Sequence, residues 1–525
     1  MKKIEKLAAV CAALFFLLAS AAVCQEAAAS SEPVAAEENS AEQAVQPKKE
    51  KKAKKEKPAK EKKEKPSKEK PAKEPKAKPI KKAKFDQAKY DEAFAKGDYD
   101  ACAGMLLDKD KKKDLIMNWL DADMLMYHST NYQASGKGFL DTYAKMQQAT
   151  SEFNASDESK SSRSSGNSIK YRGAEYERYL VWSMRLACAL SLQRDDIAKG
   201  IMNDYVGTFM QEIQELRAKN AQLEAEAEKA LEGDEFKSAQ EKLVSSGVNF
   251  SFAPPPAKSD ARYENSSFFN YLGTIAYALG GDFDHAEDFG AVYKVPQAKE
   301  IAKIPAGKGR LEVVALSGTI GRRSDVSAGK EATVTKLRLP YVNKDVPLYT
   351  KIAYPVFDPA EQDHAIKSVR VLLSNGSSAR AQLIEDFDEA VKIDVARKAY
   401  GAYSLSVFRN VIKNSVLVAS VIGAAIAVQQ ASGVSQIAAV LAQVALDASI
   451  EAAAGTVANL EHADIRQGIY FPNKASAAGF TVEPGTYNVT VEYLDGAGNV
   501  VESKAIQNVV VERGKLTARV SSCEK

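Results

Sequence analysis

Two periods of apolar residues divide the chain into a helical part and a strand-rich part. From Phe85 to about Val295, apolar residues recur every three or four positions, the spacing of one face of an α-helix. After Pro305 the period changes to two, the spacing of a strand with one buried face. We therefore expect an α+β multidomain protein in which the helices precede most of the strands.

The helical part contains pairs of helices joined by a recurring tight turn. The pattern Gly-Asp-aromatic stands between two apolar-periodic stretches at 97–99 and again at 281–283. Glycine permits the turn, and the aspartate side chain can cap the helix that follows. This device resembles the turn of a tetratricopeptide repeat. Because the copies are unevenly spaced, the prediction for 85–300 is an irregular helical-repeat (tetratricopeptide-like) domain.

Two more helical pairs are expected in the same region. One runs from Leu115 to Met146 around Gly136 and Gly138, and the other spans 176–205. The charged, Ala/Glu-rich stretch 210–245 follows. Its apolar positions are sparse for a coiled-coil arm, so an exposed helical hairpin is the favoured interpretation.

The strand-rich part is interrupted by a helical insert. Strands are predicted in 305–385 and again in a C-terminal region, 463–522. They are expected at 311–316, 332–339, 348–356, 366–373, 379–384, 468–471, 487–493, 500–506 and 516–520. The Asp495-Gly496 pair predicts a hairpin turn. We expect one β-sandwich-like domain, interrupted by an Ala-rich helical insert at 386–462.

The insert contains 33 consecutive residues without a formal charge, 414–446. Gln429, Gln430, Ser432 and Gly433 predict a break between two apolar helices. One interpretation is a membrane-inserting hairpin with small residues along its seam, although each arm is short for a hydrocarbon core. The other is a pair of helices buried against the β domain or against a second subunit.

The N-terminus has the composition of an export signal. Lys2, Lys3 and Lys6 precede an apolar run from Leu7 to Val23, so 1–24 is expected to be a signal peptide. Two processing routes stay open. Cys24 is a candidate for lipidation, but Val23 is a poor residue before a lipoprotein cleavage site. Cleavage by the ordinary signal peptidase after Ala21 or Ala22 is the alternative.

Composition then singles out residues 25–84 as a spacer, acidic at first and Lys/Glu/Pro-rich from 47. The stretch 47–84 holds 19 Lys, 6 Glu and 6 Pro and carries a net charge of +13, so the rest of this +3 chain carries −10. Such segments bury too little apolar surface to fold. In extended form 47–84 reaches on the order of 100 Å, which suits a spacer that crosses or contacts peptidoglycan. A plain solvated linker is the alternative, and nucleic-acid binding is not expected because the tail lacks Arg and aromatic residues.

No local motif for catalysis, cofactor binding or metal binding is found. The four histidines (His128, His285, His364 and His462) stand far apart and pair with no cysteine at ligand spacing. Gly329-Lys330 lacks the rest of a phosphate-binding loop, and no nucleophile-elbow or zinc-protease motif is present. The five cysteines show no paired spacing that would establish a disulfide. We therefore expect no enzyme, and the sequence supplies no catalytic, cofactor or metal residues.

Several stretches resemble a family of uncharacterised bacterial exported proteins, many of them lipoproteins. The resemblance rests on YRGAEYERYLVWSMRLACALSL at 171–192, YENSSFFNYLGTIAYALGGDFDHA at 263–286, Ala463-Asp464-Ile465-Arg466, Pro472 and Val482-Glu483-Pro484-Gly485-Thr486-Tyr487. It covers about 85–520 and excludes the Lys/Pro-rich tail. It implies an envelope location and association with outer-membrane or peptidoglycan-synthesis lipoproteins. It brings no catalytic residues.

Within that stretch, Asp464 and Arg466 are interpreted as a structural pair. Arg466 can hold a carboxylate or cap carbonyls where the helices meet the sheet; a ligand-binding role is the alternative. The predicted function is a non-enzymatic periplasmic adaptor that binds protein partners through its helical grooves. An envelope protein that associates with the membrane or oligomerises through 414–446 is the alternative, and a hydrolase whose site assembles only in the fold is the third.

Overall fold

The structure, a computed structural model, describes residues 85–108, 115–154, 157, 164, 168–339, 344–358, 365–432, 443–444 and 461–524. The predicted signal peptide, Cys24 and the spacer lie outside these residues, as does most of 433–460. Half of the protein is helical and 22% is strand. The α+β fold class is therefore confirmed.

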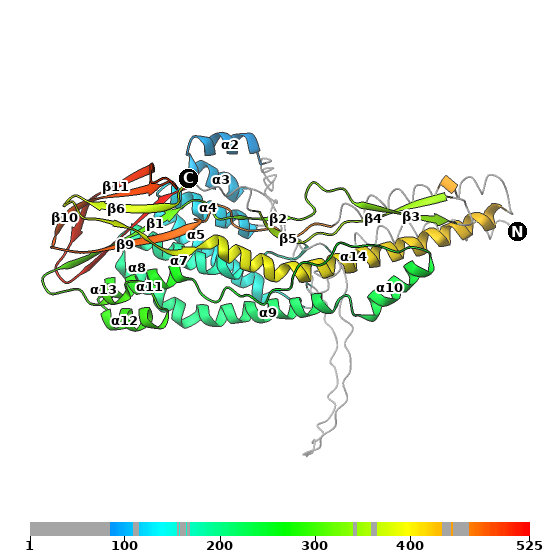
Figure 1. Ribbon diagram of the computed structural model, residues 1–525, viewed down its shortest axis with the longest axis horizontal. Helices are drawn as coiled ribbons and strands as arrows, with labels where there is room; N and C mark the ends of the chain where they lie inside the picture. The colour runs from blue at the N-terminus through cyan, green and yellow to red at the C-terminus, as the bar shows by residue number, and fades with distance from the viewer. Residues whose placement is uncertain are drawn as a thin grey trace, which may run out of the picture. The chain divides into compact units, whose positions relative to one another are not determined.

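The helical half comprises most of the chain before residue 303 (Figure 1). Its α-helices are α2 (Gln87–Ala95), α3 (Tyr99–Asp108), α4 (Leu115–His128), α5 (Tyr132–Ser151), α7 (Glu175–Ser191), α8 (Asp195–Asp204), α9 (Met210–Lys229), α10 (Asp234–Ser245), α11 (Ser267–Leu279), α12 (Phe283–Val292) and α13 (Ala298–Ala302). A π-helical turn, η2 (Tyr205–Phe209), joins α8 to α9.

The two Gly-Asp-aromatic turns have the predicted form. Gly97 and Gly281 have φ values of 72° and 75°, a conformation that favours glycine. Asp98 accepts a hydrogen bond from the backbone N–H of Ala101, and Asp282 accepts one from His285. Each aspartate thereby satisfies one of the free N–H groups at the start of a helix.

The turn between α4 and α5 was predicted at the wrong place. It lies at 129–131, where Thr130 has a φ of 66°, whereas Gly136 and Gly138 are inside α5. A Cβ atom on Gly138 would lie 2.0 Å from a carboxylate oxygen of Asp123 on α4. This glycine serves close packing of two helices and not a turn.

The charged stretch 210–245 does not form the expected hairpin. α9 and α10 do not fold back on each other; each instead packs along the long helix α14 (Phe387–Ser432). Ala239 and Leu243 of α10 share an apolar cluster with α14, whereas Ile213 and Leu216 of α9 belong to the main core of the helical half. The two helices therefore need no apolar seam between them.

The strands form two four-stranded sheets and two short hairpins. They are β1 (Gly309–Ser317), β2 (Arg322–Asp325), β3 (Thr333–Leu339), β4 (Lys344–Thr350), β5 (Pro355–Asp358), β6 (Ser368–Leu373), β7 (Ser378–Arg380), β8 (Gln382–Asp386), β9 (Lys474–Val482), β10 (Gly485–Leu494), β11 (Val500–Val511) and β12 (Leu516–Cys523). The sheet orders are β12-β1-β9-β8 and β11-β10-β6-β7, and β2 pairs with β5 and β3 with β4.

Strands from both sides of α14 share each four-stranded sheet. β1 pairs with β9 and, in parallel, with β12, and β6 pairs with β10. One apolar cluster takes side chains from both sheets, among them Val313, Val371 and Val489. The insert therefore interrupts a single strand-rich unit. The predicted hairpin at Asp495-Gly496 is also confirmed, because it joins β10 to β11.

Several strand predictions were wrong. Residues 468–471 form no strand, the expected strands 348–356 and 379–384 are each divided between two strands (β4 and β5, β7 and β8), and neither β2 nor the Ala/Ser-rich β9 was foreseen. Six of the nine residues of β9 are buried, since it lies between β1 and β8 with helices over one face. A strand that is buried on both faces does not show alternation, and small residues further weaken its signal.

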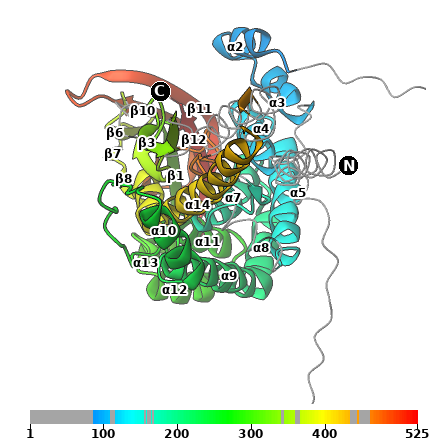
Figure 2. The same ribbon diagram turned by 90° about the vertical axis from the view of Figure 1, so that its right-hand side faces the viewer.

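The insert begins as one continuous helix, α14, of 46 residues. No break occurs at Gln429 or Gln430; the helix continues to Ser432, and Gly433 lies outside the described residues. The distal half of α14 lies between α10 and the β3–β4 hairpin (Figures 1 and 2). One row of buried residues recurs along it every three or four positions: Val407, Val411, Asn414, Val418, Val421, Ala425 and Val428.

Candidate functional site

A six-residue segment between α14 and β9 runs across the helical half without joining a sheet. We call this segment, Arg466–Phe471, the strap. The backbone N–H of Gly468 donates to the Glu177 carboxylate (2.8 Å), and that of Ile469 donates to Asp121 (2.7 Å). We expected a strand at 468–471. Its backbone N–H groups are instead bound by side chains of α7 and α4, in place of the carbonyl groups of a neighbouring strand.

Glu177 is positioned by the start of its own helix. It occupies the first turn of α7, where one carboxylate oxygen accepts the backbone N–H of Ala174 (2.6 Å) and the Tyr171 hydroxyl. This leaves the second oxygen for Gly468. The side chain is fully buried. A buried carboxylate needs such donors, because burial without them costs several kcal/mol.

The second half of the strap is held by aromatic residues. The hydroxyls of Tyr470 and Tyr90 are 2.7 Å apart, and the Tyr470 ring lies 5.4 Å from that of Phe94. Phe471 stacks on Phe139 of α5. Burial, followed by this hydrogen bond, raises the pKa of Tyr90, so its hydroxyl stays protonated. Together with the two carboxylates, these contacts bring α2, α4, α5 and α7 to one short segment.

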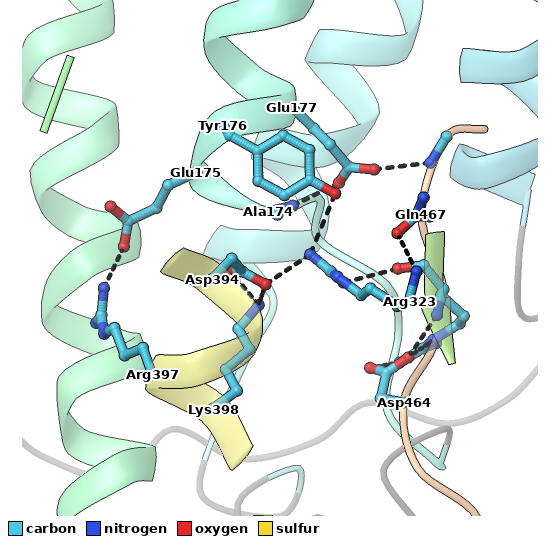
Figure 3. Close-up of polar contacts among 12 residues, drawn as sticks. Ala174, Glu175, Tyr176, Glu177, Arg323, Asp394, Arg397, Lys398, Asp464 and Gln467 are labelled. Carbon is cyan, nitrogen blue, oxygen red and sulfur yellow. Dashed lines mark hydrogen bonds and ion pairs between the residues drawn. The ribbon is translucent and has the colours of Figure 1, made fainter. Parts of the chain in front are cut away.

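The charged centre beside the strap is Arg323 of β2 (Figure 3). Its guanidinium lies 2.7 Å from a carboxylate oxygen of Asp394 on α14 and donates to the carbonyl of Arg466 (2.8 Å). Gln467 completes the link, because it accepts from the Arg323 backbone N–H and donates to the carbonyl of Gly321. β2, α14 and the strap therefore meet at one arginine.

A second ion-pair group connects α14 to α7 and α9. Glu175 pairs with Arg217 (2.9 Å) and with Arg397 (3.0 Å), and Arg397 also reaches Glu224 (3.0 Å). Glu175 and Arg397 are almost fully buried. Charges that are buried in this way are stable only as pairs, because an uncompensated partner is strongly destabilising. These pairs therefore fix the base of α14 against the helical half.

The predicted pair Asp464 and Arg466 is brought together. The guanidinium makes two contacts of 2.8 Å with the two Asp464 oxygens and donates to the carbonyl of Ile169. Arg466 also lies over the ring of Tyr171. Burial alone would raise the pKa of Asp464, but the hydrogen bonds and charge of Arg466 hold it below its usual value. Arg466 thus binds a carboxylate and a carbonyl at the place where helices meet strands.

The electrostatics suit a fixed support better than a proton-transfer centre. Burial would raise the pKa of Asp394, but Arg323 and Lys398 lower it below the usual value. Burial would likewise lower the pKa of Arg323, but Asp394 and neighbouring groups raise it. Both members are therefore ionised at neutral pH and bound to each other. Within the described ranges, no group of three His, Cys, Asp or Glu side chains is placed to hold a metal ion.

Sequence reasoning found Asp464 and Arg466 but missed Arg323, Asp394 and Glu177. The two predicted residues are two positions apart, so their pairing is a local property. Arg323 and Asp394 are 71 positions apart, and Glu177 and Gly468 are 291 apart. No spacing rule connects such residues in a single sequence.

Comparisons with protein-family models, curated proteins and solved structures found no match to this chain. The resemblance to exported lipoproteins therefore stays a prediction from the sequence.

Proposed function

We propose that this protein is a non-enzymatic adaptor of the cell envelope, which binds protein partners through an irregular tetratricopeptide-like helical domain. One observation carries the proposal: side chains of the helical half hold the strap, a segment without regular secondary structure, through the backbone N–H groups of Gly468 and Ile469. Recognition of backbone groups together with side-chain contacts is how many domains bind peptides. A surface with this chemistry suits a protein-binding module.

The β part then serves as the support of this module. In this proposal the two sheets form a β-sandwich-like domain, and α14 leaves it as an insert. The ion pairs of Arg323 and Arg397 hold the base of α14 to the helical half. Rigid connections of this kind keep a binding surface in one geometry and so reduce the entropy lost on binding.

The envelope location rests on the N-terminal sequence. We propose export through residues 1–24 to the periplasm, with an outer-membrane anchor if Cys24 is lipidated. The basic stretch 47–84 would contact the anionic peptidoglycan and set the distance between the anchor and the folded part. Such a contact weakens as salt concentration rises.

A pull-down from envelope extracts tests the adaptor function. The full chain and a chain lacking 47–84 are compared at low and high salt. The proposal expects a protein partner on both chains, and salt-sensitive retention on peptidoglycan only with 47–84 present. Absence of any specific partner contradicts the adaptor function. Equal retention of both chains on peptidoglycan, insensitive to salt, contradicts the role of the spacer.

A second candidate function is membrane association or oligomerisation through α14. Val416 and Ile426 are 59% and 38% exposed, and they lie on one face with the exposed Ala419 and Gly423. Among the described helices, α14 is long and apolar enough to span a membrane, although 44% of its most apolar window is buried inside the protein. No charged side chain interrupts this face from Asn414 to Ser432.

Extraction of a Cys24→Ala chain distinguishes this candidate, because the variant cannot be lipidated. If the variant stays in the membrane fraction after carbonate and high-salt washes, or forms oligomers in detergent, α14 association is supported. A variant that is fully soluble and monomeric contradicts it.

A further inference from the structure

The end of β12 reaches the helical half at His128, the last residue of α4, whose side chain is only 5% exposed. The ring nitrogen Nδ1 lies 2.9 Å from a carboxylate oxygen of Glu524, which directly follows β12, and Nε2 lies 3.3 Å from the carbonyl oxygen of Tyr470. The other oxygen of Glu524 accepts a hydrogen bond from the Tyr99 hydroxyl at the start of α3. One carboxylate therefore joins the end of β12 to two helices.

Only the charged imidazole of His128 suits both of its oxygen neighbours. A neutral imidazole has one N–H and one lone pair, so one of its nitrogens would face an oxygen with no proton between them. Glu524 does not supply that proton. Burial would raise its pKa, but the contact with His128 and the charge of that ring hold it below the usual value. Because the contact between Nδ1 and Glu524 is not aligned as a hydrogen bond, its strength comes from charge.

The position of His128 in α4 favours the same charged form. The C-terminal end of a helix carries a partial negative charge, which stabilises a cation in the last turn. Burial acts in the opposite direction, because it favours the neutral ring. Coupling between two groups is reciprocal. Since His128 favours the ionised form of Glu524, the ring binds its proton more tightly when Glu524 is in place than when it is away.

We propose that Tyr99, His128 and Glu524 form a pH-sensitive latch, which holds the end of β12 firmly while His128 is protonated and loosens when His128 loses its proton. Histidine is the side chain that changes charge between about pH 5 and 8, so the latch weakens as the pH rises through this range. The latch does not depend on the adaptor function, and it can be measured on the purified full chain without any partner.

Five other titratable groups around the latch stay neutral. The hydroxyls of Tyr99, Tyr127 and Tyr470 remain protonated, because burial raises the pKa of each. Burial likewise raises the pKa of the Cys102 thiol. Cys523 is buried as well, which favours the uncharged thiol. None of these groups therefore gains a charge as the pH rises to 8.

Two charged groups near the latch keep their charge over the same range. Asp100 of α3 accepts a hydrogen bond from the Ser129 hydroxyl (2.6 Å). Lys504 of β11 favours the ionised form of Glu524. Aspartate and lysine side chains ordinarily titrate near about pH 4 and about pH 10. Among the groups around the latch, His128 is therefore the one that switches between charged and neutral forms near neutral pH.

The latch lies where the sheet pairing ends. The register of β12 with β1 runs to Cys523, so Glu524 lies beyond the last paired residue. On the helical side, α2 and α3 pack on α4 through a small apolar cluster that is separate from the main core. Segments with few buried contacts open at a lower free energy than the core does. Loosening of the latch should therefore appear first at the end of β12.

The first test measures the proton affinity of His128 in the full chain with isotopically labelled histidines. Glu524→Gln keeps the shape of the side chain but removes its charge, so it should weaken proton binding at His128 at least about fivefold. NMR titration of the ring detects this as a midpoint at lower pH, and a His128→Gln chain identifies the signal. His285 is the internal control, because it pairs with a different carboxylate, Asp282 (2.8 Å), and should keep its midpoint. An unchanged midpoint of His128 overturns the proposal.

The second test measures how often the end of β12 opens. Amide hydrogen exchange at 521–523 is compared at about pH 5 and about pH 8, with the intrinsic effect of pH on exchange removed. Protection in the wild type should fall at least about fivefold at the higher pH, whereas Glu524→Gln should show low protection at both values. The amides of 489–491 in β10 are the reference and should show no such change. Equal wild-type protection at both pH values overturns the proposal, and this result does not require any variant to fold.

Discussion

The carboxylate of Glu177 accepts the backbone N–H of Gly468, 291 positions further along the chain, at 2.8 Å. One side chain in the first turn of α7 thus fixes the segment that leads into β9. Because the same carboxylate also caps α7 through Ala174, helix and strap are stabilised by one group.

The first prediction is that Glu177→Gln destabilises the fold by about 1–3 kcal/mol, the cost of leaving a buried donor unsatisfied. The amide of glutamine has a single acceptor oxygen, so it cannot serve Gly468, Ala174 and the Tyr171 hydroxyl as the carboxylate does. Urea unfolding measures the loss. Glu92→Gln, which alters an exposed pair with Lys96, is the control and should change stability by less than about 0.5 kcal/mol. Equal effects of the two substitutions would contradict the role of Glu177.

The second prediction concerns the space around the strap. Gly468→Ala should destabilise by about 1–3 kcal/mol, because the added Cβ overlaps the Phe471 ring and leaves the core overpacked. Gly104→Ala is the matched control. A Cβ at Gly104, on an exposed position of α3, meets nothing within 4 Å, so this change should be neutral or stabilise by about 0.5–1 kcal/mol. Thermal melting of both variants distinguishes the two explanations. If both variants lose the same stability, the loss is a general effect of replacing glycine and not of the packing around Gly468.

The third prediction compares a buried and an exposed ion pair whose N–O distances, 2.7 and 2.6 Å, are nearly the same. Arg323→Met should cost about 3–5 kcal/mol, because it leaves the buried Asp394 with fewer cations. Arg194→Met breaks an exposed pair with Asp196 at 2.6 Å and should cost about 0–1 kcal/mol. If the two variants unfold at the same urea concentration, the ion pair between Arg323 and Asp394 does not stabilise the fold as we infer.

The fourth prediction is a pH dependence that arises from Asp464. Its pKa in the folded protein lies below the value of about 3.9 expected for the unfolded chain. The stabilisation by Arg466 is therefore fully present above about pH 4, and it is lost as the pH falls through the folded pKa. The stability difference between the wild type and Arg466→Gln should be constant from pH 5 to 7 and shrink below pH 4. A difference that grows on acidification would show that another group dominates.

The fifth prediction separates the two faces of α14. Val418 is buried, so Val418→Asp should destabilise by about 4 kcal/mol through an unpaired buried charge. Val416 is mostly exposed, so Val416→Asp should change the free energy of unfolding by less than about 0.5 kcal/mol. If α14 binds a membrane or a second copy, the Val416 variant nevertheless loses that association in flotation or light-scattering assays. If the Val416 variant still associates, this face of α14 is not the one that binds the membrane or the second copy.

The sequence by itself determined the class of each region and the local devices. The change of apolar period separated helices from strands, Asp98 and Asp282 identified two helix starts, and Asp464 with Arg466 identified an ion pair. These features depend on residues within a few positions of each other, where backbone geometry alone brings side chains together.

Only the tertiary structure decided which distant groups satisfy each other. It placed Gly138 in a helix contact, buried β9 between two strands, and set the strap on Glu177 and Asp121 in place of a sheet. The physical reason is that a buried donor or charge requires a partner but does not specify where in the chain that partner stands. The site at Arg323 and Gly468 could therefore be found only once the fold had brought its members together.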